Sequence, residues 1–204
     1  MERSLSIVVT GRYDGSYGGD SNGNFSVFVD RDGGLYGWAA DAFDGHLELT
    51  GSASVIDGLV AGNVSSGSTF NGSIDGSGNL TGTWTLPPNE SGTFSGSRTV
   101  SVSSSIDHDL IAMFAGSWVG TTVSNQGNSS FSATLDDVGN ISMPAPNQRV
   151  AGAITSTSTS SASFSGLRDD GTEFSGTLTL PDQLNAQFNN SVTGESGTYS
   201  ATKQ

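Results

Sequence analysis

The chain has no cysteine and few positive charges among its 204 residues. Without cysteine it can form neither a disulfide bond nor a thiolate metal site. Seven Lys and Arg residues stand against 20 Asp and Glu residues, Lys203 is the only lysine, and the net charge at pH 7 is −13. Proteins that bind phosphate backbones need clustered Lys and Arg side chains. We therefore expect neither nucleic acid nor an anionic membrane surface as a partner.

Long apolar runs are also missing. No segment reaches the roughly 18 apolar residues of a membrane-spanning helix. The first ten residues carry an apolar run too short for a signal peptide, so we expect either that the protein stays inside the cell or that a leader has been removed. An acidic, cysteine-free chain rich in Gly, Ser, Thr and Asn is typical of bacterial exported proteins. On that ground we expect an extracellular, cell-surface or periplasmic location.

What the chain does contain is an internal duplication. Three pairs of matching segments carry it: 25–35 (FSVFVDRDGGL) and 131–141 (FSATLDDVGNI), 70–74 (FNGSI) and 174–178 (FSGTL), and 91–96 (SGTFSG) and 196–201 (SGTYSA). Their offsets stay between 104 and 106 residues along the copies. A repeat of this length indicates a duplicated domain rather than a short solenoid unit. We predict one domain over residues 1–104, and a short linker with a second domain over residues 105–204.

Within each copy, apolar and small polar residues alternate with a period of two. Leu80, Gly82, Trp84 and Leu86, for example, alternate with three threonines. Such runs end at Asp-Gly, Asn-Gly or Gly-Asn pairs, which is typical of antiparallel strands joined by tight hairpins. In the first copy the runs lie near 15–21, 23–30, 34–40, 47–55, 59–65, 68–75, 79–86 and 91–99.

Eight short strands in sequential order predict an all-β protein of two tandem eight-stranded antiparallel up-and-down β-barrels. Periodicity does not separate a barrel from a β-sandwich, which is the alternative. Residues 105–114 depart from the alternation, because capping residues precede an apolar run there. We predict a short helical linker in this segment that plugs one end of the second barrel.

Signatures of catalysis or metal binding are weak. The motif Gly19-Asp-Ser-Asn-Gly23 has the letters of a hydrolase nucleophile elbow but joins two β-runs, whereas the elbow requires a strand followed by a helix. His46 and His108 are the only histidines, so no catalytic triad can be assembled without an arbitrary choice of serine. The segments 30–34 and 75–79 lack the ligand spacing of calcium loops and fit hairpin turns. We expect no catalytic residue, metal site or cofactor.

One segment, residues 36–46, interrupts the alternation and has no close counterpart in the second copy. It combines aromatic, acidic and histidine side chains, and binding residues favour loops on a rigid scaffold. We predict ligand-binding residues here, namely Tyr36, Trp38, Asp41, Phe43, Asp44 and His46. The alternative is that the aromatic residues close a barrel end or seal a contact between the copies.

Each copy also resembles the barrel domain of transferrin-binding protein B-like surface lipoproteins. The resemblance rests on an opening strand motif, Tyr13-Asp-Gly-Ser-Tyr17 and Phe114-Ala-Gly-Ser-Trp118, and on a closing Gly-Thr-Phe94 or Gly-Thr-Tyr199. The family's Gly-Pro dipeptide is absent from both copies. The resemblance implies eight-stranded barrels and the binding of a host protein or haem at the cell surface, and it transfers no binding residue.

Together these patterns predict a non-enzymatic, exported or cell-surface binding module whose ligand is a protein, a glycan or haem. A structural or adhesive surface domain without a small-ligand site is the alternative, and a hydrolase is a third.

Overall fold

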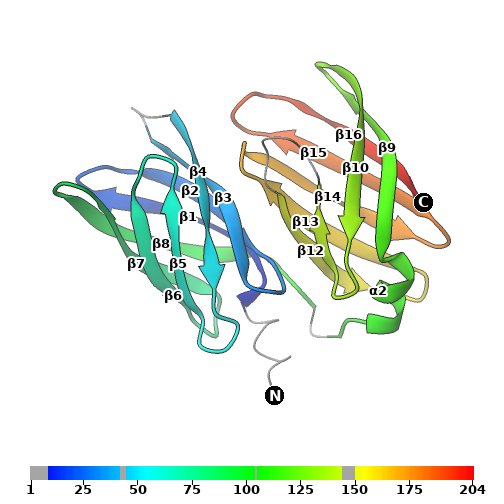
Figure 1. Cartoon of the computed structure of the whole chain (residues 1–204), viewed down its shortest axis with the longest axis horizontal. Helices are drawn as coiled ribbons and strands as arrows, with labels where there is room; N and C mark the ends of the chain where they lie inside the picture. The colour runs from blue at the N-terminus through cyan, green and yellow to red at the C-terminus, as the bar shows by residue number, and fades with distance from the viewer. Residues whose placement is uncertain (1–8, 42–44, 104, 144–149) are drawn as a thin grey trace. The chain divides into compact units, whose positions relative to one another are not determined.

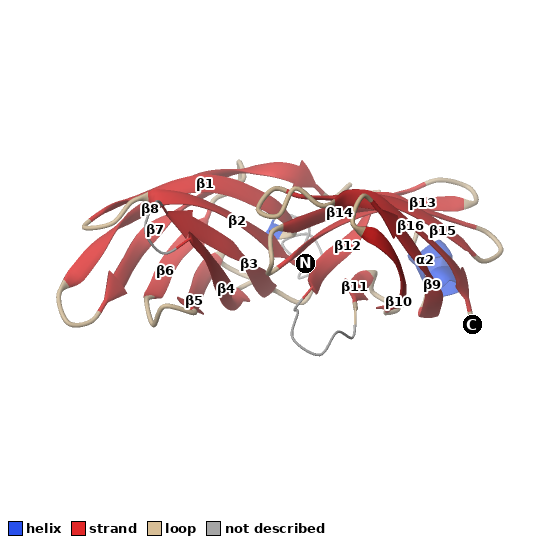
Figure 2. Ribbon diagram, turned by 90° about the horizontal axis from the view of Figure 1, so that it is seen from above, coloured by secondary structure: helices blue, strands red, loops and turns tan. Residues whose placement is uncertain are grey.

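The structure is a computed structural model that describes residues 9–41, 45–103, 105–143 and 150–204. Nearly all of its regular structure is β-strand (Figures 1 and 2). The chain divides into two compact units, Met1–Ser101 and Val102–Gln204. Within the described residues each unit contains a closed antiparallel barrel of eight strands, so the predicted fold class is confirmed and the sandwich alternative is wrong. In the same ranges no helix is both long and apolar enough to cross a membrane.

The first barrel, barrel 1, follows chain order, and β1 closes it by pairing with β8. Its strands are β1 (Gly11–Gly19), β2 (Gly23–Val29), β3 (Gly34–Asp41), β4 (Gly45–Ala53), β5 (Leu59–Val64), β6 (Thr69–Ile74), β7 (Asn79–Leu86) and β8 (Glu90–Ser101). Strand β7 coincides with its predicted run. Strand β1 begins four residues earlier than predicted, and its register with β8 shifts between Arg12 and Tyr13. An irregularity of this kind breaks the alternation on which the prediction rested.

The hairpin turns use aspartate carboxylates to bind backbone amides. In the β6–β7 turn, Asp75 Oδ1 accepts hydrogen bonds from the backbone N of Ser77 at 2.8 Å and of Asn79 at 2.9 Å. The side-chain amide of Asn79 donates to Asp75 Oδ2, and this bond is the main reason why the pKa of Asp75 lies below its ordinary value. Asp136 binds the backbone N of Asn140 in the same way in the second unit. These contacts show that the acidic Gly-rich segments build turns.

The two ends of barrel 1 differ in packing. One end, here called the closed end, carries the β2–β3, β4–β5 and β6–β7 turns. Buried apolar side chains fill it: Val9, Tyr13, Val29, Ala53 and Ile74. The Tyr13 hydroxyl donates a hydrogen bond to the carbonyl oxygen of Val9 at 2.8 Å, which ties the segment before β1 to the barrel. The other end carries the β1–β2, β5–β6 and β7–β8 turns and is here called the open end.

Tyr13, at the closed end, should make the free energy of unfolding depend on pH in the alkaline range. Burial raises the pKa of Tyr13 to about 12, and the nearby Arg98 guanidinium offsets this shift only in part. An unfolded tyrosine ionises near pH 10, so above that pH the unfolded chain releases a proton that native Tyr13 keeps. The free energy of unfolding should therefore fall between about pH 10 and pH 12, by on the order of 2 kcal/mol from Tyr13.

Urea unfolding of the wild type and of Tyr13→Phe at several pH values measures this effect. The variant loses the hydroxyl and should show a shallower alkaline decline than the wild type. Parallel declines of the two proteins would contradict the assignment.

The second barrel, barrel 2, has the same order and is closed by β9 pairing with both β10 and β16. Its strands are β9 (Gly116–Ser124), β10 (Gly127–Leu135), β11 (Asn140–Ser142), β12 (Val150–Thr157), β13 (Ser161–Arg168), β14 (Thr172–Thr179), β15 (Gln183–Asn190) and β16 (Ser196–Lys203). Its third strand is much shorter than β3, the corresponding strand of barrel 1. The two copies therefore differ most at the segment where their sequences diverge.

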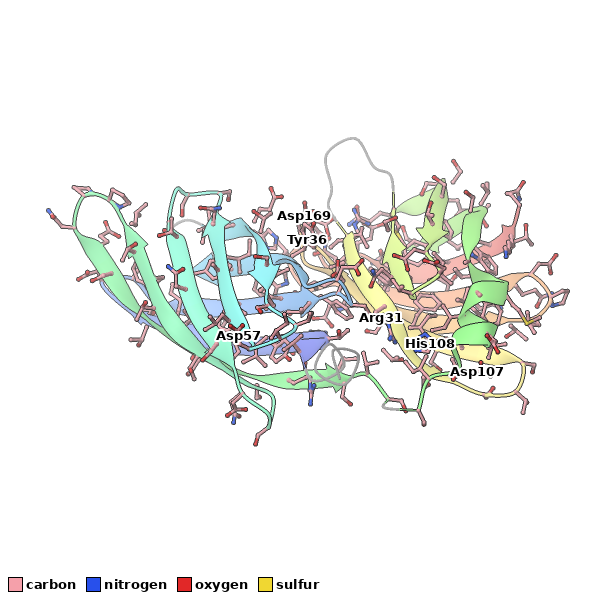
Figure 3. All side chains as sticks on the ribbon, turned by 60° about the horizontal axis from the view of Figure 1, so that its bottom comes forward. Arg31, Tyr36, Asp57, Asp107, His108 and Asp169 are labelled. Atoms are coloured by element: carbon pink, nitrogen blue, oxygen red, sulfur yellow. The ribbon has the colours of Figure 1, made fainter. Side chains whose placement is uncertain are left out.

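A short helix, α2 (His108–Phe114), closes one end of barrel 2. Asp107 caps it by accepting hydrogen bonds from the backbone N of Asp109 and Leu110, and Figure 3 shows Asp107 and His108 at its start. Three side chains of the helix, Leu110, Ile111 and Phe114, are buried in the core of barrel 2. The predicted helical plug is thus present, three residues shorter than residues 105–114 at its start.

Candidate functional site

The interior of barrel 1 contains a cavity of about 110 Å³ that opens to solvent. Residues of all eight strands or their turns line it. They are Tyr17, Ser21, Phe25, Val27, Leu35, Ala39, Leu47, Leu49, Val60, Val64, Ser66, Ser68, Phe70, Leu80, Trp84, Leu86, Glu90 and Phe94. The lining is apolar apart from a few side chains near the open end.

Three phenylalanines form a layer across the middle of the cavity wall. The ring of Phe94 meets Phe25 at a centroid distance of 5.9 Å and Phe70 at 6.2 Å, edge to face in both pairs. The ring of Phe94 lies against two facing glycines, Gly72 and Gly82, where a Cβ atom would come within 2.8 Å and 2.4 Å of its Cζ atom. The absence of side chains at these glycines lets the ring lie against the wall and leaves the centre of the barrel free.

The mouth of the cavity adds aromatic and polar groups. Tyr17 and Trp84 pack edge to face at a centroid distance of 6.2 Å, and the indole Nε1 of Trp84 donates a hydrogen bond to the carbonyl oxygen of Gly18 at 3.3 Å. From the β5–β6 turn, the hydroxyl oxygens of Ser66 and Ser68 lie 3.2 Å apart. Apolar walls with a few polar groups at the entrance are the usual composition of a small-molecule site.

Barrel 2 fills the corresponding space with closely packed rings. The duplication aligns Phe25, Trp84 and Phe94 with Phe131, Phe188 and Tyr199. The Tyr199 ring lies 4.9 Å from Phe131 and 4.7 Å from Phe188, which is closer than the aromatic pairs of barrel 1. Burial also raises the pKa of the Tyr199 hydroxyl, although Arg168 opposes the shift. The side chains of α2 add to this core at one end, so the interior of barrel 2 around Tyr199 is closely packed.

The structure places Tyr36, Trp38 and Asp41 on β3 and His46 on β4, four of the six predicted ligand-binding residues. Residues 36–41 lie in a regular strand rather than in a loop. Tyr36, Trp38 and His46 alternate with the cavity-lining Ala39 and Leu47, so they lie on the outer face of the barrel.

On that outer face the rings of Trp38 and His46 stack at a centroid distance of 5.5 Å. Asp41 ends β3, whereas Phe43 and Asp44 lie outside the described residues. The ligand-binding role of these six residues stays a prediction.

The cavity was not among the sequence-based predictions, although the residues that line it follow the alternation of the strands. The same two strands contribute Leu35, Ala39, Leu47 and Leu49 to the cavity wall. Period-two alternation assigns these residues to the inner face, but an inward apolar residue is equally expected in a filled core. Whether the inward side chains meet in the centre depends on their sizes on eight strands at once, and a single strand does not carry that information.

Comparison with known proteins provides no family for this chain. No protein-family model and no curated protein matches it. Among solved structures, a candidate outer membrane protein from Bacteroides fragilis is similar with 12% identity and a TM-score of 0.31, over 98% of this chain and 99% of that one. A protein of unknown function from Nostoc punctiforme, of the DUF3598 family, is similar with 10% identity and a TM-score of 0.29, over 100% of this chain and 99% of that one. Similarities at these TM-scores support no argument about function, and the resemblance to transferrin-binding protein B-like lipoproteins stays a prediction.

Proposed function

We propose that the protein is a non-enzymatic binding module and that barrel 1 holds a small, largely apolar molecule. The observation that carries this proposal is an apolar cavity, filled at one end and open at the other, inside a closed barrel. Eight strands give an interior that either is filled by side chains or holds one small ligand. A dry apolar cavity of about 150 Å³ is known to bind benzene, so 110 Å³ suits one ring or an alkyl chain, and the open mouth leaves room for the rest of a larger ligand.

The cavity favours this ligand class over the classes expected from the sequence. Among the described lining residues there is no His, Cys or Met side chain to ligate a haem iron. A glycan would lose hydrogen bonds to water against the apolar wall without replacing them. A purely adhesive domain has no need of an open, hollow barrel.

Features of the lining also favour binding over hydrolysis. Among the described lining residues, only Tyr17 and Glu90 have ionisable side chains. Both histidines lie elsewhere: His46 is on the outer face, and His108 belongs to the second unit. Export to the cell surface or periplasm, and the kinship with transferrin-binding protein B-like lipoproteins, belong to the same proposal and rest on the composition and motifs of the sequence.

Titration with an uncharged fluorescent probe such as phenylnaphthylamine tests the proposal. The probe should gain fluorescence with one site per chain, and uncharged decanol should displace it. Ala39→Phe adds a ring to the cavity wall from β3 and should weaken probe binding at least about tenfold, since the ring takes most of the free space.

The matched control is Ala61→Phe, which adds the same ring on the exposed outer face of β5. It should leave the affinity for the probe unchanged. The proposal fails if the wild type does not bind the probe, or if the two variants weaken binding equally while both remain folded by circular dichroism.

A further inference from the structure

The polar groups of the cavity are gathered at its open end. Ser21, Ser66 and Ser68 come from the β1–β2 and β5–β6 turns, and Glu90 begins β8. Glu90 is exposed and is the one lining side chain, among the described residues, that carries a formal charge at neutral pH. A ligand whose body fills the cavity therefore ends close to a carboxylate.

A second carboxylate at the open end, that of Asp20, is bound to the residue that follows Glu90. Asp20 Oδ2 accepts a hydrogen bond from the backbone N of Ser91 at 2.8 Å, and the backbone N of Asp20 donates to the carbonyl oxygen of Ser91 at 3.1 Å. These two bonds join the β1–β2 turn to the residue that follows Glu90. The open end thus holds two negative charges on ordered backbone.

The described arginines of barrel 1 lie toward the other end. Arg12 begins β1 and is paired with Asp14, and Arg31 lies in the β2–β3 turn. Arg98 on β8 pairs across from Tyr13. Eight residues of extended strand, or about 26 Å, separate Arg98 from Glu90. This exceeds the Debye length of about 8 Å at physiological ionic strength, so these cations do little to offset the charge at the open end.

Aromatic rings complete the open end. Tyr17 and Trp84 line the mouth in edge-to-face contact. Aromatic rings near a carboxylate favour an organic cation, because the negative π-face and the carboxylate both attract positive charge. An anionic head group at the same place would meet two carboxylates, while the described Arg side chains of barrel 1 lie toward the other end.

We infer that the ligand of barrel 1 is a cationic amphiphile, with its alkyl or aromatic part in the cavity and its ammonium group at the open end beside Glu90. This inference rests on the proposed function and names the ligand class. The carboxylate of Glu90 then acts as the counter-ion of the ammonium group. The apolar wall contributes the part of the affinity that is common to ligands with different head groups. Long-chain carboxylates are expected to be poor ligands although their tails fit equally well.

Three ligands, each with a chain of ten carbon atoms, test the inference by displacement of phenylnaphthylamine at low ionic strength and below their micelle concentrations. Decyltrimethylammonium should bind more tightly than decanol, and decanol more tightly than decanoate. The ratio of dissociation constants between decanoate and the ammonium ligand should be at least about tenfold, as expected for unit charges near a protein surface. Raising the salt concentration should reduce this ratio.

Glu90→Gln should weaken binding of the ammonium ligand by about fivefold and leave decanol unchanged, because only the charge is removed. Asp57→Asn is the matched control. It removes the same charge in the β4–β5 turn of the closed end, where Figure 3 labels Asp57, and should leave all three affinities unchanged.

The outcomes separate the inference from the proposed function. If the probe and decanol bind but the ammonium ligand binds no better than decanoate, the cationic ligand class is wrong and the apolar site stands. An equal effect of Glu90→Gln and Asp57→Asn on the ammonium ligand would overturn the role of Glu90. If neither the probe nor any of the three ligands binds, the proposed function fails and the inference fails with it.

Discussion

Replacement of Trp118 by alanine is expected to lower the free energy of unfolding by about 3–5 kcal/mol. Trp118 is 1% exposed in the core of barrel 2 and has the largest side chain among the fully buried residues. Its indole Nε1 donates a hydrogen bond to the carbonyl oxygen of Phe114 at 3.1 Å, at the end of α2. The substitution therefore removes a large apolar volume and leaves a buried acceptor without its donor.

Urea unfolding followed by far-ultraviolet circular dichroism measures this loss. Val119→Ala is the matched control, because Val119 is the next residue of β9 and is 48% exposed on the outer face. It should change the unfolding free energy by no more than about 0.5 kcal/mol. A loss for Trp118→Ala as small as that of the control would show that the helix and the barrel do not share one core.

Replacement of Gly82 by valine is expected to destabilise the protein by about 3 kcal/mol, the upper range for overpacking of a core. A Cβ atom at Gly82 would lie 2.2 Å from the carbonyl oxygen of Asn71 and 2.4 Å from Cζ of Phe94. The first contact is with the backbone of β6, which is held in the sheet by its hydrogen bonds and has little freedom to move. The ring of Phe94 would have to swing into the cavity, so probe binding should weaken as well.

Thermal unfolding and the probe titration together test this second prediction. The control is Gly76→Ala in the β6–β7 turn, where an added Cβ atom meets nothing within 4 Å and the backbone φ angle is not in the left-handed region. The control should shift the midpoint little and leave the probe affinity unchanged. If the thermal unfolding midpoint of Gly82→Val equals that of the wild type, the Phe94 ring and the β6 backbone can move aside at little cost in free energy. That result would contradict the close packing around Gly82.

Much of the fold was predictable because the side-chain period of a strand is a local property. Leu80 and Trp84 alternate with threonines in the sequence, and in β7 both are buried. The three threonines of β7 are exposed, as a strand with one inner and one outer face requires. The capping Asp107 and the apolar run after it likewise located α2.

The candidate site was less predictable. The segment around Trp38 was singled out because it interrupts the alternation, combines aromatic, acidic and histidine side chains, and has no close counterpart in the second copy. Alanine fits either face of a sheet, so the strand continues through Ala39 and Ala40 to Asp41. The hairpin that was singled out does border the cavity, but it does so through Ala39 and Leu47.

By itself the sequence determined two copies of an eight-stranded β-unit, the inner and outer faces of their strands, and the surplus of negative charge. The tertiary structure decided that β8 returns to β1, that barrel 1 contains an apolar cavity, and that the rings of barrel 2 lie closer together. The physical reason is that a cavity is a difference between the volume a barrel encloses and the volume its inward side chains fill. That difference is set by residues such as Gly82, Phe94 and Tyr199, which lie far apart in the chain and meet only when each barrel closes.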